Sequence, residues 1–256
     1  MFNRIGVIGA GAMGRGIAQL FASSGQQVLI YDTRAEAIDD AIAFNRNLLQ
    51  RSVAKGKLSE ADFEATMARM QPAAELDALK DCDLVIEAIV ELLEVKQKLF
   101  DQLEAIVRDD CVLATNTSSL SVTRIASTCK RPERVAGFHF FNPVPLMKIV
   151  EVVRGERTDE RYVQGLVELA ENAGHFAAIT PDTPGFLVNH AGRAFGTEAL
   201  RILSEGVATP QQIDRILRDG PGFRMGPFEL FDLTGLDVSH AVMESVYHQY
   251  YEEARF

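Results

Sequence analysis

Arg4-Ile5-Gly6-Val7-Ile8-Gly9-Ala10-Gly11-Ala12-Met13-Gly14 begins as a short apolar segment and runs directly into a glycine-rich loop. Residues 12–24 follow with apolar side chains at helical spacing, Ile17, Leu20 and Phe21 on one face, before Gly25. Residues 27–31 form a second apolar segment that ends at Asp32. A strand, a glycine loop, a helix and a second strand in this order predict a βαβ unit.

The spacing of the glycines indicates what the loop binds. Gly9 permits a tight turn, Gly11 lets the backbone approach a pyrophosphate, and Gly14 allows the helix to pack closely on the strand. The helix that begins at Ala12 and Met13 presents free N–H groups and the positive end of its dipole to the phosphates. We therefore expect a dinucleotide at this loop.

Asp32 indicates which dinucleotide is bound. A carboxylate at the end of the second strand accepts hydrogen bonds from ribose hydroxyls and repels a 2′-phosphate, so NAD is favoured over NADP. Arg34 lies two residues further on and could accommodate a phosphate, which leaves NADP as the alternative.

Strand and helix patterns alternate as far as about residue 182. Two successive helices at 35–55 and 59–70 exceed a minimal crossover, so they are expected to project as a hairpin. After Pro181-Asp182-Thr183-Pro184-Gly185 the pattern is helical only. The expected fold class is α/β: a Rossmann-type doubly wound, mostly parallel sheet with a hairpin at about 35–70, followed by a smaller all-α domain. The expected domains are residues 1–182 and 183–256. Further strands are expected at 84–88, 112–115, 135–138 and 149–153, and further helices at 92–107 and 159–174.

Composition narrows the function classes. Lys and Arg number 26 against 36 Asp and Glu, a net charge of −10 without an acidic tail, which argues against binding to nucleic acid or anionic membranes. No apolar run reaches the roughly 18 residues that span a bilayer, and we expect no signal peptide. Cys82, Cys111 and Cys129 lack metal-ligand spacing. We therefore expect these cysteines to be small core residues of a cytoplasmic protein, and we expect no metal site.

Three polar clusters follow apolar segments, where ligands of open parallel sheets bind: Glu87 to Glu91, Asn116 to Ser119, and His139. A histidine beside a nicotinamide can take the proton of an alcohol while hydride leaves the adjacent carbon. Glu151, on the next apolar segment, could orient this imidazole. The other histidines, His175, His190, His240 and His248, are interpreted as packed, hydrogen-bonded residues.

Six segments in order resemble the 3-hydroxyacyl-CoA dehydrogenase family over essentially the whole chain. They are GAGAMG at 9–14, EAIVE at 87–91, NTSSL at 116–120, HFFNPVPLMKIVEV from His139, DTPGFLVN at 182–189 and GPFELFDLTGLD from Gly226.

The resemblance implies roles for individual residues. His139 matches the family's catalytic base and Glu151 the acid paired with it, while Ser118 and Asn189 match residues that hold the oxygens of the substrate. The positions that match cofactor contacts are Gly9, Gly11, Ala12, Met13, Gly14, Asp32, Glu91, Lys96, Ser118 and Asn142. Lys55, in the hairpin, matches a contact to a coenzyme A phosphate; a solvated helix face is the alternative there.

The activity implied is NAD-dependent oxidation of an L-3-hydroxyacyl-CoA to the 3-oxoacyl-CoA, in fatty-acid or phenylacetate/adipate-type degradation. The helical domain is expected to close over the acyl-CoA and to form a homodimer. Two alternatives remain open. One is a β-hydroxyacid dehydrogenase acting on a free acid, and the other is a non-catalytic nucleotide-binding relative.

Two departures from the family pattern stand out. His190 follows Asn189 where the family usually has Arg. The chain stops at Glu253-Ala254-Arg255-Phe256, whereas members of the family continue with further helices and a Gly/Lys-rich segment. We therefore expect the helical domain to be incomplete and the chain to be a piece of a longer protein. The acyl group, with or without a terminal carboxylate, stays open; Arg193, Arg201 and Arg224 are candidate partners for such a carboxylate.

Overall fold

The computed structural model describes residues 2–251, without the side chain of Arg193. Its internal contacts divide the chain into two compact units, Met1–Asp182 and a second unit that begins at Thr183. No helix in the described part of the chain is both long and apolar enough to cross a membrane.

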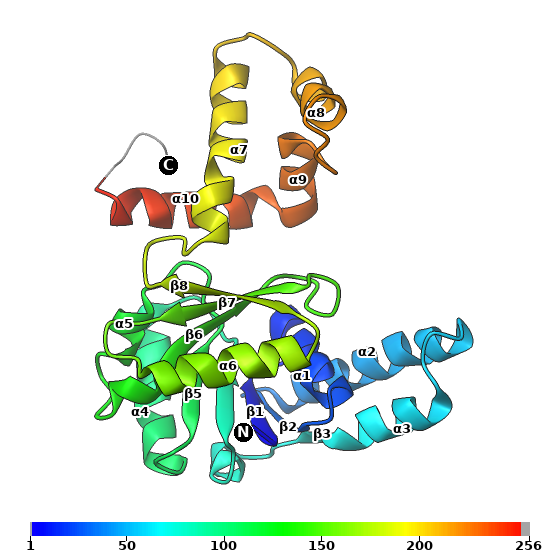
Figure 1. Cartoon of the computed structure of the whole chain (residues 1–256), viewed down its shortest axis with the longest axis vertical. Coiled ribbons are helices and arrows are strands. Elements are labelled where there is room, and N and C mark those ends of the chain that lie inside the picture. The colour runs from blue at the N-terminus through cyan, green and yellow to red at the C-terminus, as the bar shows by residue number, and fades with distance from the viewer. Residues whose placement is uncertain (1, 252–256) are drawn as a thin grey trace. The chain divides into compact units, whose positions relative to one another are not determined.

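The first unit is built on a single sheet with helices on both faces (Figure 1). In the described residues its eight strands lie in the order β3-β2-β1-β4-β5-β6-β7-β8. All neighbouring strands pair in parallel except β6 and β7, which are antiparallel. The expected doubly wound, mostly parallel sheet is therefore confirmed. The strands are β1 (Arg4–Ile8), β2 (Gln27–Tyr31), β3 (Met70–Pro72), β4 (Leu84–Glu87), β5 (Val112–Thr115), β6 (Val135–Phe140), β7 (Ile149–Arg154) and β8 (Phe176–Pro181).

The α-helices in the described part of this unit begin within one residue of the positions that the sequence indicated, except the helix at Val122–Ala126, which was not expected. Ser59 caps α3 by accepting a hydrogen bond from the backbone N–H of Asp62 at 3.0 Å. Figure 1 shows α2 and α3 as a hairpin that extends away from the sheet. The helices are α1 (Ala12–Ser23), α2 (Ala35–Ala54), α3 (Glu60–Arg69), α4 (Leu93–Ile106), α5 (Val122–Ala126) and α6 (Glu160–Asn172), with the short 3-10 helices η1 (Leu76–Leu79) and η2 (Pro132–Arg134).

Three expectations about strands were wrong or incomplete. The second hairpin helix ends at Arg69 instead of Met70, because Met70 opens β3 and pairs with Val28 of β2. The segment after α6, for which no strand was expected, forms β8 beside β7. The strand expected at 135–138 continues to Phe140, so His139 lies inside β6 and not beyond it.

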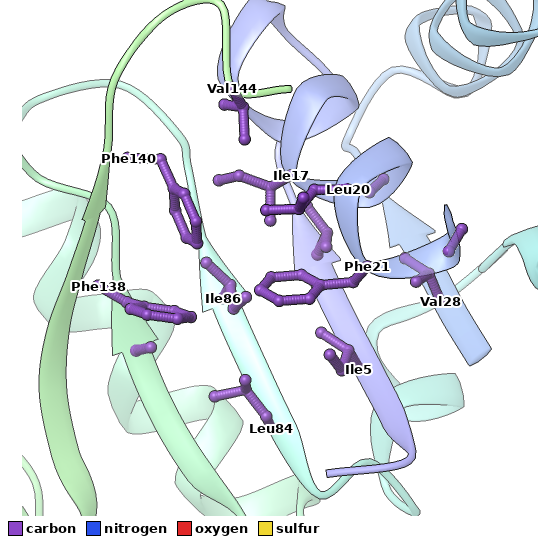
Figure 2. Packing of buried hydrophobic residues seen from close by; sticks show 14 of the residues in the cluster. Ile5, Ile17, Leu20, Phe21, Val28, Leu84, Ile86, Phe138, Phe140 and Val144 are labelled. Carbon is purple, nitrogen blue, oxygen red and sulfur yellow. The ribbon is translucent and has the colours of Figure 1, made fainter. Parts of the chain in front are cut away.

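Aromatic packing joins the glycine-loop helix to the strand that carries His139. Phe21 of α1 is fully buried and lies 6.1 Å from Phe138 and 5.9 Å from Phe140, measured between ring centroids. Figure 2 shows this cluster between α1 and the sheet, with Ile5 and Ile86 against the same rings. Because side chains alternate along a strand, His139 lies on the opposite face of β6 from these two phenylalanines.

Within the described residues of the second unit, the regular elements are all helices. Thr209 begins α8 with a capping box, in which its hydroxyl accepts from the backbone of Gln212 and the Gln212 side chain accepts in return. Asp214 of α8 accepts the N–H groups of Phe228 and Glu229 and so caps α9. The helices are α7 (Val188–Ser204), α8 (Pro210–Asp219), α9 (Pro227–Thr234) and α10 (Leu236–Gln249).

The three cysteines lie in the interior, as expected of small core residues. Burial raises the pKa of Cys82 to about 11 and the pKa of both Cys111 and Cys129 to about 12. Their thiols therefore stay protonated at neutral pH.

Truncating Phe21 tests the packing between α1 and the sheet. Phe21→Ala leaves a cavity against Phe138 and Phe140, so we expect the free energy of unfolding to fall by about 3–5 kcal/mol. Urea denaturation measures this change. Phe176→Ala, at a side chain that is 67% exposed, is the control and should cost less than about 1 kcal/mol. Equal losses for the two variants would contradict the packing described here.

Candidate active site at the carboxyl ends of the strands

The glycine loop has the geometry of a ligand cradle. Gly9 adopts φ +97°, and a Cβ on it would lie 2.4 Å from the carbonyl oxygen of Ala88. A Cβ on Gly14 would lie 1.7 Å from the carbonyl oxygen of Gly9, so α1 can pack this closely only with glycine there. Apart from Gly11 and its two chain neighbours, no described atom lies within 4 Å of a Cβ built on Gly11, which leaves room for a ligand there.

Asp32 closes the loop from the end of β2. Its carboxylate accepts the N–H of Ala10 at 2.8 Å and the N–H of Arg34 at 3.0 Å. A cavity of about 550 Å³ opens beside it and is lined by Gly9, Gly11, Asp32, Arg34, Lys98 and Gln102, among other residues. The open space at Gly11, the start of α1 at Ala12 and Met13, and this carboxylate fit the pyrophosphate and ribose of a dinucleotide.

A buried charged network lies at the carboxyl ends of β4 and β5. The Lys96 ammonium, 1% exposed, contacts Glu87 Oε1 at 2.5 Å and Glu91 Oε2 at 3.2 Å. Glu87 also accepts the hydroxyl of Thr115 at 2.7 Å. The sequence singled out Glu91 and Lys96, whereas Thr115 was taken only as the end of an apolar strand. Glu87 and Thr115 both stand at the ends of apolar segments, but the sequence did not show that these two strands are neighbours and that the hydroxyl would meet the carboxylate.

Glu91 organises the turn that carries Ser118. Its Oε1 accepts the Thr117 hydroxyl at 2.5 Å and the backbone N–H groups of Ser118 and Ser119 at 2.9 and 3.2 Å. Partial burial acts to raise the pKa of Glu91, but the Lys96 charge and these hydrogen bonds outweigh it and hold the pKa below its ordinary value. Glu91 is therefore an ionised anchor for this turn.

His139 and Glu151 face each other across the one antiparallel strand pair of the described sheet. The two residues are register partners, and His139 Nδ1 lies 2.6 Å from Glu151 Oε2. Both side chains are buried, with Glu151 at 0% exposure. Asn116, at the end of β5, accepts the N–H of Phe140 at 2.9 Å and so ties the Ser118 turn to the His139 strand. Within the first unit, the glycine loop, the Glu91 network, the Ser118 turn and the His139–Glu151 pair thus lie along one edge of the sheet.

The remaining candidates lie on other segments of the chain. Asn142 is exposed on the segment that follows β6, and Lys55 is exposed at the C-terminal end of α2. Asn189 lies in the first turn of α7, in the second unit. His190 follows it and contacts the hydroxyl of Tyr250 through Nδ1 at 3.0 Å. Among the residues from 2 to 251, no group of three or more His, Cys, Asp or Glu side chains is arranged to hold a metal ion.

Two family models match this chain over nearly its full length. Residues 4–182 match the 3-hydroxyacyl-CoA dehydrogenase NAD binding domain, and residues 185–256 match the 3-hydroxyacyl-CoA dehydrogenase C-terminal domain. The first of these matches indicates that the cofactor of this domain is NAD.

Similar proteins carry related names. A 3-hydroxyadipyl-CoA dehydrogenase from Escherichia coli is 49% identical over 98% of this chain, and a 3-hydroxybutyryl-CoA dehydrogenase from Clostridioides difficile is 40% identical over 96%. A crystal structure of a 3-hydroxybutyryl-CoA dehydrogenase from Escherichia coli superposes with a TM-score of 0.97 at 48% identity, covering 99% of this chain. The chain spans 53% and 54% of the length of the two Escherichia coli proteins, and 88% of the Clostridioides difficile protein.

Replacing Glu91 tests its electrostatic role. Because the folded-state pKa lies below its ordinary value, the carboxylate stabilises the folded protein above that ordinary value, and this stabilisation is lost as the pH falls through the folded-state pKa. We expect Glu91→Gln to lower the free energy of unfolding at pH 7 by about 1 kcal/mol, since partial exposure weakens the interaction. The difference from the unmodified protein should shrink in urea titrations below about pH 4.5.

The matched control is Glu168→Gln, which changes an exposed carboxylate of α6. It should alter the stability by less than about 0.5 kcal/mol at either pH. A Glu91→Gln difference that stays constant from pH 7 to pH 4 would show that charge does not account for the role of Glu91.

Proposed function

Because this chain belongs to the 3-hydroxyacyl-CoA dehydrogenase family, we propose that it oxidises an L-3-hydroxyacyl-CoA to the 3-oxoacyl-CoA with NAD as hydride acceptor. The observation that supports this most is the buried pair of His139 and Glu151, at the same edge of the sheet as the glycine loop. NAD, when bound, supplies a nicotinamide carbon that accepts the hydride.

The geometry of the pair determines which nitrogen does the work. A carboxylate only accepts hydrogen bonds, so the 2.6 Å contact requires His139 Nδ1 to carry the proton. In the neutral ring Nε2 then bears a lone pair and takes the proton of the substrate hydroxyl as the hydride leaves C3. The Glu151 carboxylate stabilises the imidazolium that results. In the reverse direction the same nitrogen returns the proton.

The other candidate residues have supporting roles in the proposal. Ser118, on the turn held by Glu91, and Asn189 of α7 hold the hydroxyl and thioester oxygens of the substrate. Glu91 and Asn142 are proposed to contact the cofactor. Lys96 acts there through Glu91, because its ammonium is buried between the two carboxylates.

The substrate class follows the relatives, whose names specify 3-hydroxyadipyl-CoA and 3-hydroxybutyryl-CoA. Lys55, on the exposed hairpin, is proposed as a contact for the coenzyme A phosphate, which an acidic protein would otherwise repel. The helical unit is proposed to close over the acyl-CoA and to form a homodimer. We place the reaction in the cytoplasm, in fatty-acid or phenylacetate/adipate-type degradation.

Comparing substrates tests the activity. NADH formation should be observed with at least one of 3-hydroxybutyryl-, 3-hydroxyhexanoyl- and 3-hydroxyadipyl-CoA, and kcat/KM should be far lower with the corresponding free acids. A preference for free 3-hydroxy acids would favour a β-hydroxyacid dehydrogenase. NADH binding without turnover of any of the CoA thioesters would favour a non-catalytic relative.

His139→Gln tests the assignment of the base. The amide keeps the approximate shape of the imidazole but cannot take the substrate proton, so kcat should fall by roughly 100- to 10,000-fold. The dissociation constant of NADH, measured by fluorescence, should stay within about threefold. Turnover near that of the unmodified protein would show that another group removes the proton.

Asp32 variants test the choice of NAD. Removing the carboxylate in Asp32→Ala takes away ribose hydrogen bonds and the repulsion of a 2′-phosphate, so kcat/KM for NAD should fall by about 10- to 100-fold while the preference for NAD over NADP decreases. Arg34 and Lys98 line the same cavity and would then face the phosphate. Asp32→Asn, which keeps the shape without the charge, should give an intermediate preference. An unchanged NAD/NADP ratio would contradict the role of Asp32.

A further inference from the structure

The segment 141–148 joins the strand of His139 to the strand of Glu151. It also carries Asn142. All of its residues are exposed or half-buried except Val144, which is 1% exposed. Val144 is therefore the point at which this surface segment is attached to the body of the first unit.

Two contacts hold Val144 in place. Its side chain fills the space above Gly16, where a Cβ would come within 3.0 Å of the Val144 Cβ. Gly16 lies in α1, so this contact joins the segment to the helix that starts at the glycine loop. The second contact is polar: the Val144 carbonyl oxygen lies 3.0 Å from His175 Nε2.

His175 is itself fixed at the entrance to β8. Its ring is 3% exposed and lies edge-on to Phe140, with centroids 6.0 Å apart. Its Nδ1 lies 3.3 Å from the Ala173 carbonyl oxygen. The next residue, Phe176, donates its N–H to the Lys148 carbonyl at 2.8 Å. The His175 imidazole thus contacts the middle of the segment 141–148 at Val144. The backbone of the next residue, Phe176, holds the end of the segment at Lys148.

Packing alone does not explain this imidazole. An apolar side chain of the same size would fill the space beside Phe140 without placing a nitrogen in the interior, which is costly unless the nitrogen forms a hydrogen bond. At 3.0 Å the bond from Nε2 to Val144 is well formed, whereas the Nδ1 contact at 3.3 Å is at the long end. The well-formed bond is the one that reaches the segment carrying Asn142.

We propose that His175 is a positioning residue of the dehydrogenase: together with Gly16 it fixes Val144 and so holds Asn142 where it contacts the cofactor. This inference rests on the proposed role of Asn142. His175 is buried, and its effect is exerted through the backbone of residues 142–144. Losing the bond to Val144 loosens the segment and weakens cofactor binding without removing the base.

Two conservative variants separate the two ring nitrogens. A Gln side chain places its amide nitrogen near the position of Nε2, so His175→Gln keeps the donor to Val144. An Asn side chain reaches only the position of Nδ1, so His175→Asn loses this donor, and His175→Phe keeps the ring without either nitrogen. The readouts are NADH affinity by fluorescence, kcat and KM for NAD, hydrogen–deuterium exchange of residues 141–148, and Tm.

The expected result is that His175→Gln binds NADH within about twofold of the unmodified protein. His175→Asn and His175→Phe should weaken NADH binding and raise the KM for NAD by about 5- to 10-fold, the effect of one lost buried hydrogen bond, with a smaller change in kcat. The same two variants should show faster exchange in residues 141–148.

Three results would overturn the proposal: equal NADH affinity in all three variants, faster exchange without any loss of affinity, or equal losses in the Gln and Asn variants that follow their Tm. Exchange and NADH binding do not depend on turnover. They therefore test His175 separately from the substrate assays that test the dehydrogenase activity.

Discussion

The antiparallel pairing of β6 and β7 is the constraint on which the candidate active site depends. If β7 ran parallel to β6, it would begin at the opposite edge of the sheet. Glu151 would then no longer lie opposite His139. The reversal instead makes the two residues register partners, with their side chains 2.6 Å apart in a buried position. One change of strand direction thus brings the proposed base and its proposed orienting acid together from segments that are otherwise apolar.

Two further sets of contacts hold this pair at the edge of the sheet where the glycine loop lies. On one face, Phe138 and Phe140 pack on Phe21, so the strand of the base is fixed to the glycine-loop helix (Figure 2). Along the edge, Glu91 anchors the Ser118 turn through hydrogen bonds and is itself held by Lys96. The fully buried pair in this network is Lys96 with Glu87; such a pair adds little net stability, but losing one partner is costly, which suits a network that specifies geometry.

Much of this arrangement could be predicted from sequence, and the failures have physical reasons. The glycine loop, Asp32 and the alternating elements depend on local patterns, so the βαβ start and the mostly parallel sheet were predictable. Strand β3 was missed because its three residues directly follow a helix and adopt a strand conformation only by pairing with β2. His139 was expected beyond its strand because a polar residue breaks an apolar run, and only the pairing with β7 shows that the strand continues. Contacts such as Lys96 with Glu87, or His175 with Val144, depend on the tertiary fold.

The most direct test of the central claim is nitrogen-15 NMR of the His139 ring in the intact protein, assigned by comparison with the His139→Gln variant. With the ring neutral, we expect a protonated Nδ1 and an unprotonated Nε2, with the Nδ1 proton shifted strongly downfield by Glu151 and this shift lost in Glu151→Gln. A ring protonated at Nε2, or one unaffected by Glu151→Gln, would show that Glu151 does not orient His139 as a base.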